Sequence, residues 1–246
     1  SNAMRILIIS DVHANLVALE AVLSDAGRVD DIWSLGDIVG YGPRPRECVE
    51  LVRVLAPNIS VIGNHDWACI GRLSLDEFNP VARFASYWTT MQLQAEHLQY
   101  LESLPNRMID GDWTVVHGSP RHPIWEYIYN ARIAALNFPA FDTPLCFVGH
   151  THVPLYIRED EALSNVAPHH PNDGEVLDVS SGRYIINPGA VGQPRDGDPR
   201  ASYAIFEPDA QRVTFHRVEY RIADTQAQMR EAGLPESLVT RLAAGV

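Results

Sequence analysis

An α/β fold is predicted by the alternation of short apolar segments with amphipathic ones in the first quarter of the chain. Three apolar segments, RILIIS at 5–10, DIWSL at 31–35 and ISVIG at 59–63, are separated by two stretches with helical periodicity. This β-α-β-α-β order is typical of a sheet that contains parallel strands. We expect one domain over residues 4–246, and we interpret Ser1–Ala3 as the remnant of an expression tag.

The first helices are expected where a capping residue precedes an apolar stripe. Asn15 is a suitable N-cap for the first helix, and Asn79 followed by Pro80 is a cap and first-turn pair. The expected helices of this part of the chain cover residues 15–26, 46–55, 80–93 and 95–104. The middle of the chain is therefore predicted to be mainly helical.

The second half of the chain reads mostly as strands. Two strands are expected around the turn at Gly111–Asp112. The later strands are expected at 113–118, 145–149, 154–157, 183–187, 201–207 and 212–218. The turn-rich segment 164–182 is expected to be a loop with one strand in it, and polar helices follow Ile222.

Composition excludes several functional classes. The net charge of −12 and the lack of a basic run argue against binding to polymer nucleic acid. No apolar run is long enough to cross a membrane and no signal peptide is recognisable, so we expect a cytoplasmic protein. The three cysteines are scattered, which indicates buried thiols rather than a disulfide framework or a thiolate metal site.

Five of the predicted strands end in side chains that can bind a metal. These side chains are Asp11 and His13, Asp37, Asn64 with His65 and Asp66, His117, and His150 with His152. Ligands of open α/β sheets bind outside the carboxyl ends of the strands, so these residues can converge although they are far apart in the sequence. In the segment FVGHTHVP, His150 and His152 are two residues apart and point to the same side of an extended backbone.

A bound metal is the simplest explanation for this pattern. Aspartates and imidazoles crowded into one crevice are costly unless cations neutralise them. Nitrogen and oxygen ligands without thiolate suit manganese, iron, nickel or zinc. Bound cations would also make the crevice positive, which reconciles an anionic substrate with an acidic protein.

The ordered series D-x-H, G-D, G-N-H-D, V-H-G and G-H-T-H resembles the calcineurin-like metallophosphoesterase superfamily, and most closely its compact bacterial and archaeal phosphodiesterases. The resemblance implies a four-layer αββα sandwich of two mixed sheets flanked by helices. It also implies two divalent ions, with Mn²⁺ as our first expectation, bridged by Asp37. The implied ligands are Asp11, His13, Asp37 and His152 for one ion, and Asp37, Asn64, His117 and His150 for the other.

The resemblance implies hydrolysis of a phosphodiester or phosphomonoester by in-line attack of a metal-bridging hydroxide. In this pattern His65 faces the substrate and assists the leaving group, and we expect Asp66 to fix the tautomer of His65. Arg195, in a glycine-rich segment at 187–200, is the expected phosphate contact. Trp125 and Tyr127, in segment 121–137, are expected to form a wall of the site, although packing explains them equally well.

Other interpretations remain open from the sequence. The same fold can serve as a protein-binding scaffold, as in a retromer subunit that resembles this chain, or as a nuclease with added DNA-binding parts. Within the esterase interpretation, the substrate is a small or nucleotide-like ester, a dinucleotide polyphosphate or a phosphoprotein. The native substrate and the oligomeric state have no signature in the sequence. Of the remaining histidines, His97 is expected on a solvated helix face.

Overall fold

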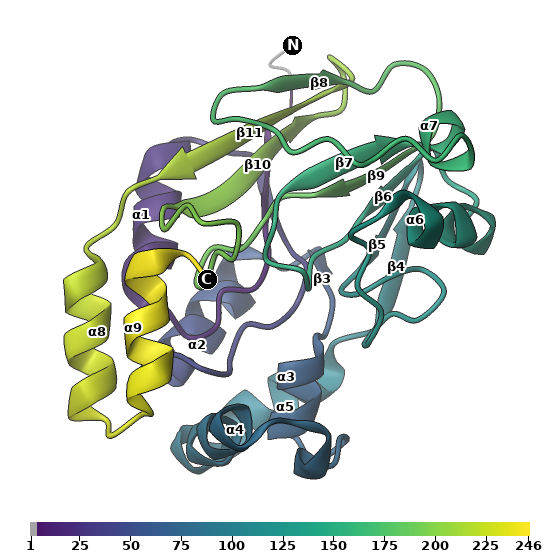
Figure 1. Ribbon diagram of the computed structural model, residues 1–246. Helices are drawn as coiled ribbons and strands as arrows, with labels where there is room; N and C mark the ends of the chain where they lie inside the picture. The colour runs from purple at the N-terminus through teal and green to yellow at the C-terminus, as the bar shows by residue number, and fades with distance from the viewer. Residues whose placement is uncertain (1–3) are drawn as a thin grey trace.

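Two β-sheets face each other and helices cover their outer faces, as the computed structural model of residues 4–246 shows (Figure 1). The segment interpreted as a tag remnant lies outside these described residues. Both sheets are mixed, so the predicted α/β class and its two flanked sheets are confirmed.

The first sheet contains the parallel strands that the sequence predicts. Its order is β3 (Ile59–Ser60), β2 (Asp31–Ser34), β1 (Ile6–Ile9), β10 (Ala201–Glu207), β11 (Arg212–Val218) and β8 (Val176–Asp178). Strands β1, β2 and β3 run parallel, whereas β10 pairs antiparallel with β1 and begins the second half of the sheet. The carboxyl ends of β1, β2 and β3 therefore lie at one edge.

The second sheet is assembled from the middle of the chain. Its order is β4 (Arg107–Asp110), β5 (Trp113–Val116), β6 (Leu145–Phe147), β9 (Tyr184–Asn187) and β7 (Leu155–Arg158). Strands β5, β6 and β9 are parallel, and the two outer strands run the other way. The ends of β5 and β6 meet those of the first sheet, where the backbone N–H of His150 donates to the Asp11 carboxylate at 3.0 Å.

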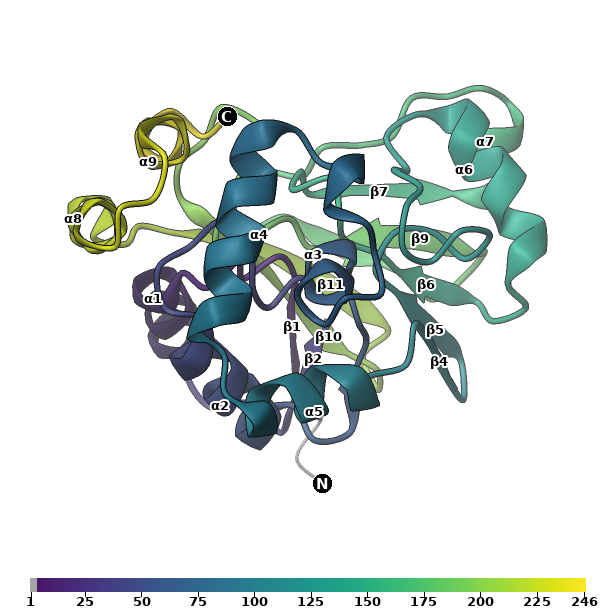
Figure 2. The same ribbon diagram turned by 90° about the horizontal axis from the view of Figure 1, so that it is seen from below.

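Helices occupy the outer layers and the lower side of the molecule (Figures 1 and 2). They are α1 (Leu16–Ala26), α2 (Pro45–Leu55), α3 (Asn64–Cys69), α4 (Pro80–Gln92), α5 (Ala95–Ser103), α6 (Ala131–Asn137), α7 (Glu159–Leu163), α8 (Ile222–Glu231) and α9 (Glu236–Ala244), with 3₁₀ turns η1 (Leu75–Glu77) and η2 (Phe138–Ala140). Helices α1 and α2 pack on the first sheet, α5 packs against α2 and α3, and α6 and α7 pack on the second sheet. Helices α8 and α9 pack against α4.

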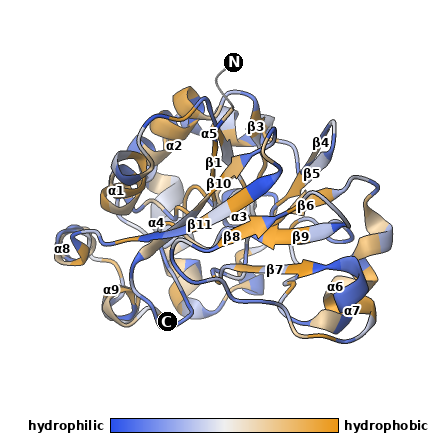
Figure 3. Ribbon diagram, turned by 90° about the horizontal axis from the view of Figure 1, so that it is seen from above, coloured by the Kyte–Doolittle hydropathy of each residue, from blue (hydrophilic) through white to orange (hydrophobic). Residues whose placement is uncertain are grey.

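Alternation along the strands creates the layers. In β1, Ile6 and Ile8 face the second sheet, while Leu7 and Ile9 face the helices. The space between the sheets is filled by aromatic rings, among them Trp33, whose ring centre lies 5.5 Å from that of Phe147. In Figure 3 hydrophobic colouring covers parts of the strands and also the helices that flank them. The two sheets are thus held as a rigid base for the loops at their edge.

Several elements differ from the sequence-based expectation. The third strand ends at Ser60, because Ile62 turns its N–H to the carbonyl of Pro105 instead of a strand partner, and α3 then starts at Asn64. Helices α6 and α7 were not expected, since each is at most seven residues long and has too few turns for a clear periodicity. The cysteines are free and buried, as expected. No helix among residues 4–246 has the length and apolarity needed to span a membrane.

Candidate metal centre

Seven side chains converge where the carboxyl ends of the two sheets meet, and we call them the buried cluster. They are Asp11, His13, Asp37, Asn64, His117, His150 and His152. Each follows a strand end, as the sequence predicts, and the most exposed of them, Asn64, is only 3% exposed. The segments that carry them also bond to one another, for example from Asp11 N–H to Gly36 at 3.0 Å. The arrangement therefore belongs to the fold and not to mobile surface loops.

The buried cluster divides into two groups that share one carboxylate. Asp11, His13, Asp37 and His152 form one group, and Asp37 forms the other with His117 and His150. Within each group the candidate ligand atoms all lie within 4.8 Å of one another. Asn64 lies beside the shared carboxylate, because the next residue, His65, donates its backbone N–H to Asp37 Oδ1 at 2.9 Å. The geometry thus provides two adjoining candidate metal positions.

Each histidine of the buried cluster turns one ring nitrogen outward to a backbone carbonyl. The contacts are His13 Nδ1 to Val39 (3.1 Å), His117 Nδ1 to Leu35 (2.7 Å), His150 Nε2 to Trp125 (3.1 Å) and His152 Nδ1 to Gln193 (2.7 Å). A carbonyl only accepts, so the outward nitrogen carries a proton, and in a neutral ring the inward nitrogen then presents its lone pair. This is how proteins orient histidines that ligate metals.

The ring nitrogens and carboxylate oxygens that point into the cluster lie close to one another, and not every close pair has a proton to share. His117 Nε2 lies 3.1 Å from Asp37 Oδ2, and His152 Nε2 lies 3.2 Å from Asp11 Oδ1. The Nε2 atoms of His13 and His152 are 3.1 Å apart. With both outward nitrogens protonated, two lone pairs oppose each other there. A cation between these atoms would turn repulsion into coordination.

Several buried polar atoms of the cluster have no hydrogen-bond partner among the described residues. They are Asp11 Oδ1, Asn64 Oδ1 and His117 Nε2. A buried polar atom left in this way costs about 1–3 kcal/mol. All three are atom types that bind divalent ions such as Mn²⁺. The residues present therefore fit a metal.

The ionisation of the cluster shows how strongly it needs positive charge. Burial would lower the pKa of His117, but Asp37 and Asp11 outweigh it and raise the pKa to about 10. Burial lowers the pKa of His150 to about 3 and that of His152 to about 4. Without a metal, the cluster thus keeps a proton on His117, beside the carboxylates. A divalent cation would neutralise the same carboxylates more completely.

The backbone of the cluster is strained. Five of its residues have positive φ: Asp11 (53°), His13 (47°), Asp37 (55°), His150 (73°) and His152 (62°). Non-glycine residues in the left-handed region cost on the order of 1–3 kcal/mol each and concentrate at functional sites. The packed sheets maintain this conformation.

His65 lies beside the cluster, but the predicted contact with Asp66 is wrong. The Asp66 carboxylate accepts backbone N–H groups from Asp37 (2.8 Å), Gly63 (3.0 Å) and Val39 (3.2 Å). His65 Nδ1 has no hydrogen-bond partner among the described residues. Consecutive residues at the start of α3 do not face each other, so one of the two side chains points away from the other. Asp66 instead holds the loop that carries Asp37.

The expected substrate contacts lie at the rim of the cluster. The Tyr127 ring stacks on His150 with 3.7 Å between ring centres, and the side chain of Trp125 is 42% exposed. The backbone N–H of Arg195 donates to the backbone carbonyl of His152 at 3.1 Å, and its guanidinium donates to Gln193 Oε1. The structure thus brings Tyr127 and Arg195 to the cluster, whereas Trp125 contributes a backbone carbonyl.

Tyr41 is a rim residue that the sequence reasoning missed. Its ring centre lies 4.4 Å from that of His65 and 4.8 Å from that of His13, and Arg195 Cζ lies 5.9 Å from it. It has φ +64° between two glycines, in the segment GYG directly after the G-D strand end. An aromatic residue flanked by glycines after a ligand loop was the available signal.

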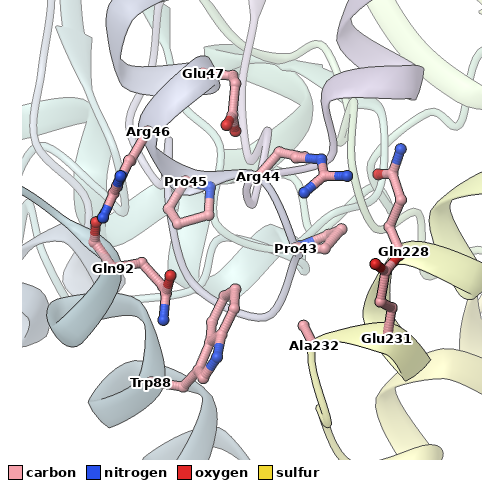
Figure 4. A pocket seen from close by; sticks show the side chains of 10 residues that line it. All are labelled: Pro43, Arg44, Pro45, Arg46, Glu47, Trp88, Gln92, Gln228, Glu231 and Ala232. Carbon is pink, nitrogen blue, oxygen red and sulfur yellow. The ribbon is translucent and has the colours of Figure 1, made fainter.

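Two pockets flank the segment that follows Tyr41. The first, of about 340 Å³, lies between α2, α4 and α8 (Figure 4) and is lined by Pro43, Arg44, Pro45, Arg46, Glu47, Trp88, Gln92, Gln228, Glu231 and Ala232. None of these belongs to the buried cluster. The second, of about 400 Å³, lies between α4 and α9 and is lined by Tyr41, Asn79, Pro80, Val81, Ala82, Ser237, Leu238 and Arg241. The second pocket shares Tyr41 with the rim.

A second concentration of acids and histidine lies at the surface, and we call Glu50, Glu96 and His97 the surface group. His97 was expected on a solvated helix face, but it is fully buried where α5 packs against α2. Its Nε2 lies 2.9 Å from Glu50 Oε1 across this contact. Its Nδ1 accepts the backbone N–H of Gln94 at 3.0 Å. The proton is therefore on Nε2, and no lone pair faces the carboxylates.

The fold and the buried cluster define an α/β protein with a candidate metal centre at the junction of two sheets. The chain belongs to the calcineurin-like phosphoesterase superfamily, whose domain matches residues 4–211. It is 42% identical over 247 residues to the uncharacterized protein MJ0912 of Methanocaldococcus jannaschii, covering 98% of both chains.

Two further comparisons agree with this family. The structure superposes on the crystal structure of a metallophosphoesterase from Sphaerobacter thermophilus with a TM-score of 0.95 and 99% identity over all of both chains. The symmetrical bis(5'-nucleosyl)-tetraphosphatase of Pectobacterium atrosepticum is 36% identical over 67 residues, which are 26% of this chain and 24% of that protein. The fold and the family are therefore those that the strand-end residues predict.

Proposed function

We propose that this protein is a phosphoesterase that depends on two divalent metal ions and hydrolyses a phosphodiester or phosphomonoester. The observation that carries the proposal is the sharing of Asp37 by two buried groups of ligand atoms. The ligands come from both sheets, so we propose that residues 4–246 act as one domain.

The buried cluster supports the choice of metal chemistry. When bound, divalent ions would activate water and neutralise the phosphate oxygens during an in-line displacement. The ligands would be Asp11, His13, Asp37 and His152 on one side, and Asp37, Asn64, His117 and His150 on the other. The set contains nitrogen and oxygen atoms only, and the amide of Asn64 favours a hard ion such as Mn²⁺.

His65 is the proposed partner of the leaving group. Burial holds the pKa of His65 well below its usual value, so its imidazole is neutral near pH 7. A neutral ring can still donate a hydrogen bond to the departing oxygen and stabilise the charge that develops there. Its position between Tyr41 and His13 supports this role.

The substrate we propose is a small or nucleotide-like phosphate ester. The acidic chain offers little attraction to polymer DNA, whereas Arg195 at the rim can bind phosphate oxygens. The name of the Pectobacterium relative makes dinucleoside polyphosphates a substrate class to test.

Release of p-nitrophenol from bis-p-nitrophenyl phosphate, with and without added Mn²⁺, tests the proposal. We expect metal-dependent turnover that Asp37→Asn abolishes and that Asp110→Asn, an exposed carboxylate on β4, retains. A wild-type protein that binds Mn²⁺ but turns over neither this ester nor a panel of cyclic nucleotides and dinucleotides would contradict the proposal. That result would favour a binding scaffold.

A further inference from the structure

Two arginines flank Tyr41 at the rim of the buried cluster. Arg195 Cζ lies 5.9 Å from the ring centre of Tyr41, and Arg241 on α9 lines the same pocket as Tyr41. The backbone of Arg195 is tied to the cluster, because its N–H donates to the backbone carbonyl of His152. The positive groups thus extend outward from the proposed reaction site.

Neither guanidinium uses all of its donors. Arg195 donates from Nε and Nη2 to Gln193 Oε1, at 3.1 and 2.7 Å. Arg241 donates from Nε to the main-chain oxygen of Val246 at 2.7 Å. Among residues 4–246 no Asp or Glu carboxylate pairs with either side chain, and Nη1 of Arg195 and both Nη atoms of Arg241 have no partner. These donors are available to a ligand.

The electrostatic environment favours an anion here. Arg241 is partly buried, and burial together with the charge of Arg195 lowers its pKa. Burial also raises the pKa of Tyr41, which keeps its hydroxyl protonated. Two like charges held near each other without an Asp or Glu side chain between them are a cost that a phosphate group would relieve.

The position of Arg241 is fixed by the fold. Leu238, Val239 and Leu242 bury α9 against its neighbours. At the end of α9, Gly245 accepts the N–H of Gly197 at 2.9 Å, in the loop that carries Arg195. Figure 1 shows the chain end returning to the centre of the molecule beside that loop. The two arginines are therefore preorganised relative to each other.

We propose that Arg195 and Arg241 form a subsite for a second phosphate group, so that the substrate carries at least two phosphates. The reacting phosphate lies at the buried cluster, the next one lies by Tyr41 between the arginines, and the remaining organic group occupies the pocket between α4 and α9. This inference rests on the proposed phosphoesterase function. Arg241 lies beyond residues 4–211, the part that matches the family domain, so the C-terminal helices supply one of the two arginines of the subsite.

Kinetic selectivity tests the subsite. We compare kcat/KM for bis(5'-adenosyl) tetraphosphate and for bis-p-nitrophenyl phosphate, which has one phosphate, in wild type, Arg241→Gln and Arg53→Gln. Arg241→Gln is expected to lower the ratio of the first to the second by about tenfold, equivalent to one charge-assisted hydrogen bond. Arg53, an exposed arginine in the last turn of α2, serves as the matched control and should leave the ratio unchanged. An unchanged ratio in Arg241→Gln overturns the subsite.

A binding measurement separates this proposal from the proposed function. Calorimetry should show that Arg241→Gln lowers the affinity for tripolyphosphate about tenfold more than the affinity for orthophosphate. Arg241→Lys should recover part of this loss of affinity. A wild-type protein without hydrolytic activity contradicts the esterase function, but this binding result still decides the subsite. Equal affinities for tripolyphosphate in wild type and Arg241→Gln overturn it. If Arg241→Gln fails to fold, Arg241→Lys and the Arg195→Gln variant carry the same comparison.

Discussion

The buried cluster and the surface group contain the same kinds of side chains, but only the buried cluster presents free lone pairs inward. His152 donates outward to Gln193 and leaves Nε2 beside Asp11, whereas His97 accepts from Gln94 and donates to Glu50. The backbone partner of each histidine therefore decides whether the other ring nitrogen presents a lone pair or an N–H to the neighbouring carboxylates. Residue type and proximity alone do not separate a metal site from a structural ion pair.

Removing one carboxylate from the buried cluster and one from the surface group should give the largest difference in metal content and turnover. Asp37→Asn is expected to reduce turnover by more than about 100-fold, beyond the loss caused by a merely supporting residue, because both metal positions lose their shared ligand. Glu50→Gln should retain the metal content of wild type. Elemental analysis and turnover of bis-p-nitrophenyl phosphate measure both effects. Equal loss of metal in the two variants would remove the distinction between the groups.

His65 tests whether a histidine beside the buried cluster acts on the substrate without holding metal. His65→Ala should lower kcat by about 10²–10³ for esters with poor leaving groups, and less for p-nitrophenyl esters, because the hydrogen bond from the imidazole N–H to the departing oxygen is lost. The bound metal should be retained, since His65 belongs to neither ligand group. A fall in kcat that is independent of the leaving group would argue against this role.

Arg195 tests the rim of the buried cluster. Arg195→Ala should raise KM by about tenfold with a smaller change in kcat, because a charge-assisted contact to phosphate is lost while the ligands remain. Steady-state kinetics measure the change. An unaltered KM would exclude Arg195 from the binding site.

The pH dependence of stability should distinguish the metal-free from the metal-loaded cluster. The pKa of His117 is about 10 in the folded protein and 6.5 in the reference state, so its contribution is complete below pH 6.5 and is lost as the pH rises towards 10. A bound metal would replace this proton, so the metal-loaded protein should not lose stability at alkaline pH. Thermal unfolding between pH 6 and 10, with and without chelator, measures it. Parallel curves would contradict the coupling.

The smallest functional effect is expected in the surface group. His97→Ala should lower the free energy of unfolding by about 1–3 kcal/mol, because a fully buried ring and its link between α5 and α2 are lost. Turnover should stay unchanged, since the ring is not part of the buried cluster. Chemical denaturation measures the stability, and a loss of bound metal would contradict our interpretation of His97.

The sequence predicted the positions of the candidate metal ligands better than their hydrogen-bond partners. Asp11, Asp37 and His117 were found because each ends an apolar strand, and strand ends are local features. Tyr41 and the outward carbonyl of Gln193 were not, since loop conformation brings them to the site. The same limit explains why His97 was expected in solvent: its burial depends on how α5 packs against α2.

The role of Asp66 shows a second limit. The residue is adjacent to His65 in sequence, and adjacency suggested a hydrogen bond between the two side chains. The chain is helical there, so the carboxylate reaches the backbone of two other loops instead. The direction of a side chain depends on the residue at which a helix begins. Sequence periodicity does not locate that residue exactly.

The left-handed backbone at Asp11, His13, Asp37, His150 and His152 has an evolutionary consequence. Glycine or asparagine at these positions relieves the strain, so losing the ligand and gaining stability go together. A related protein that no longer needs the metal centre would accumulate glycine or asparagine at these five positions and keep both sheets. Such a pattern in a related sequence would mark an abandoned reaction centre on an unchanged scaffold.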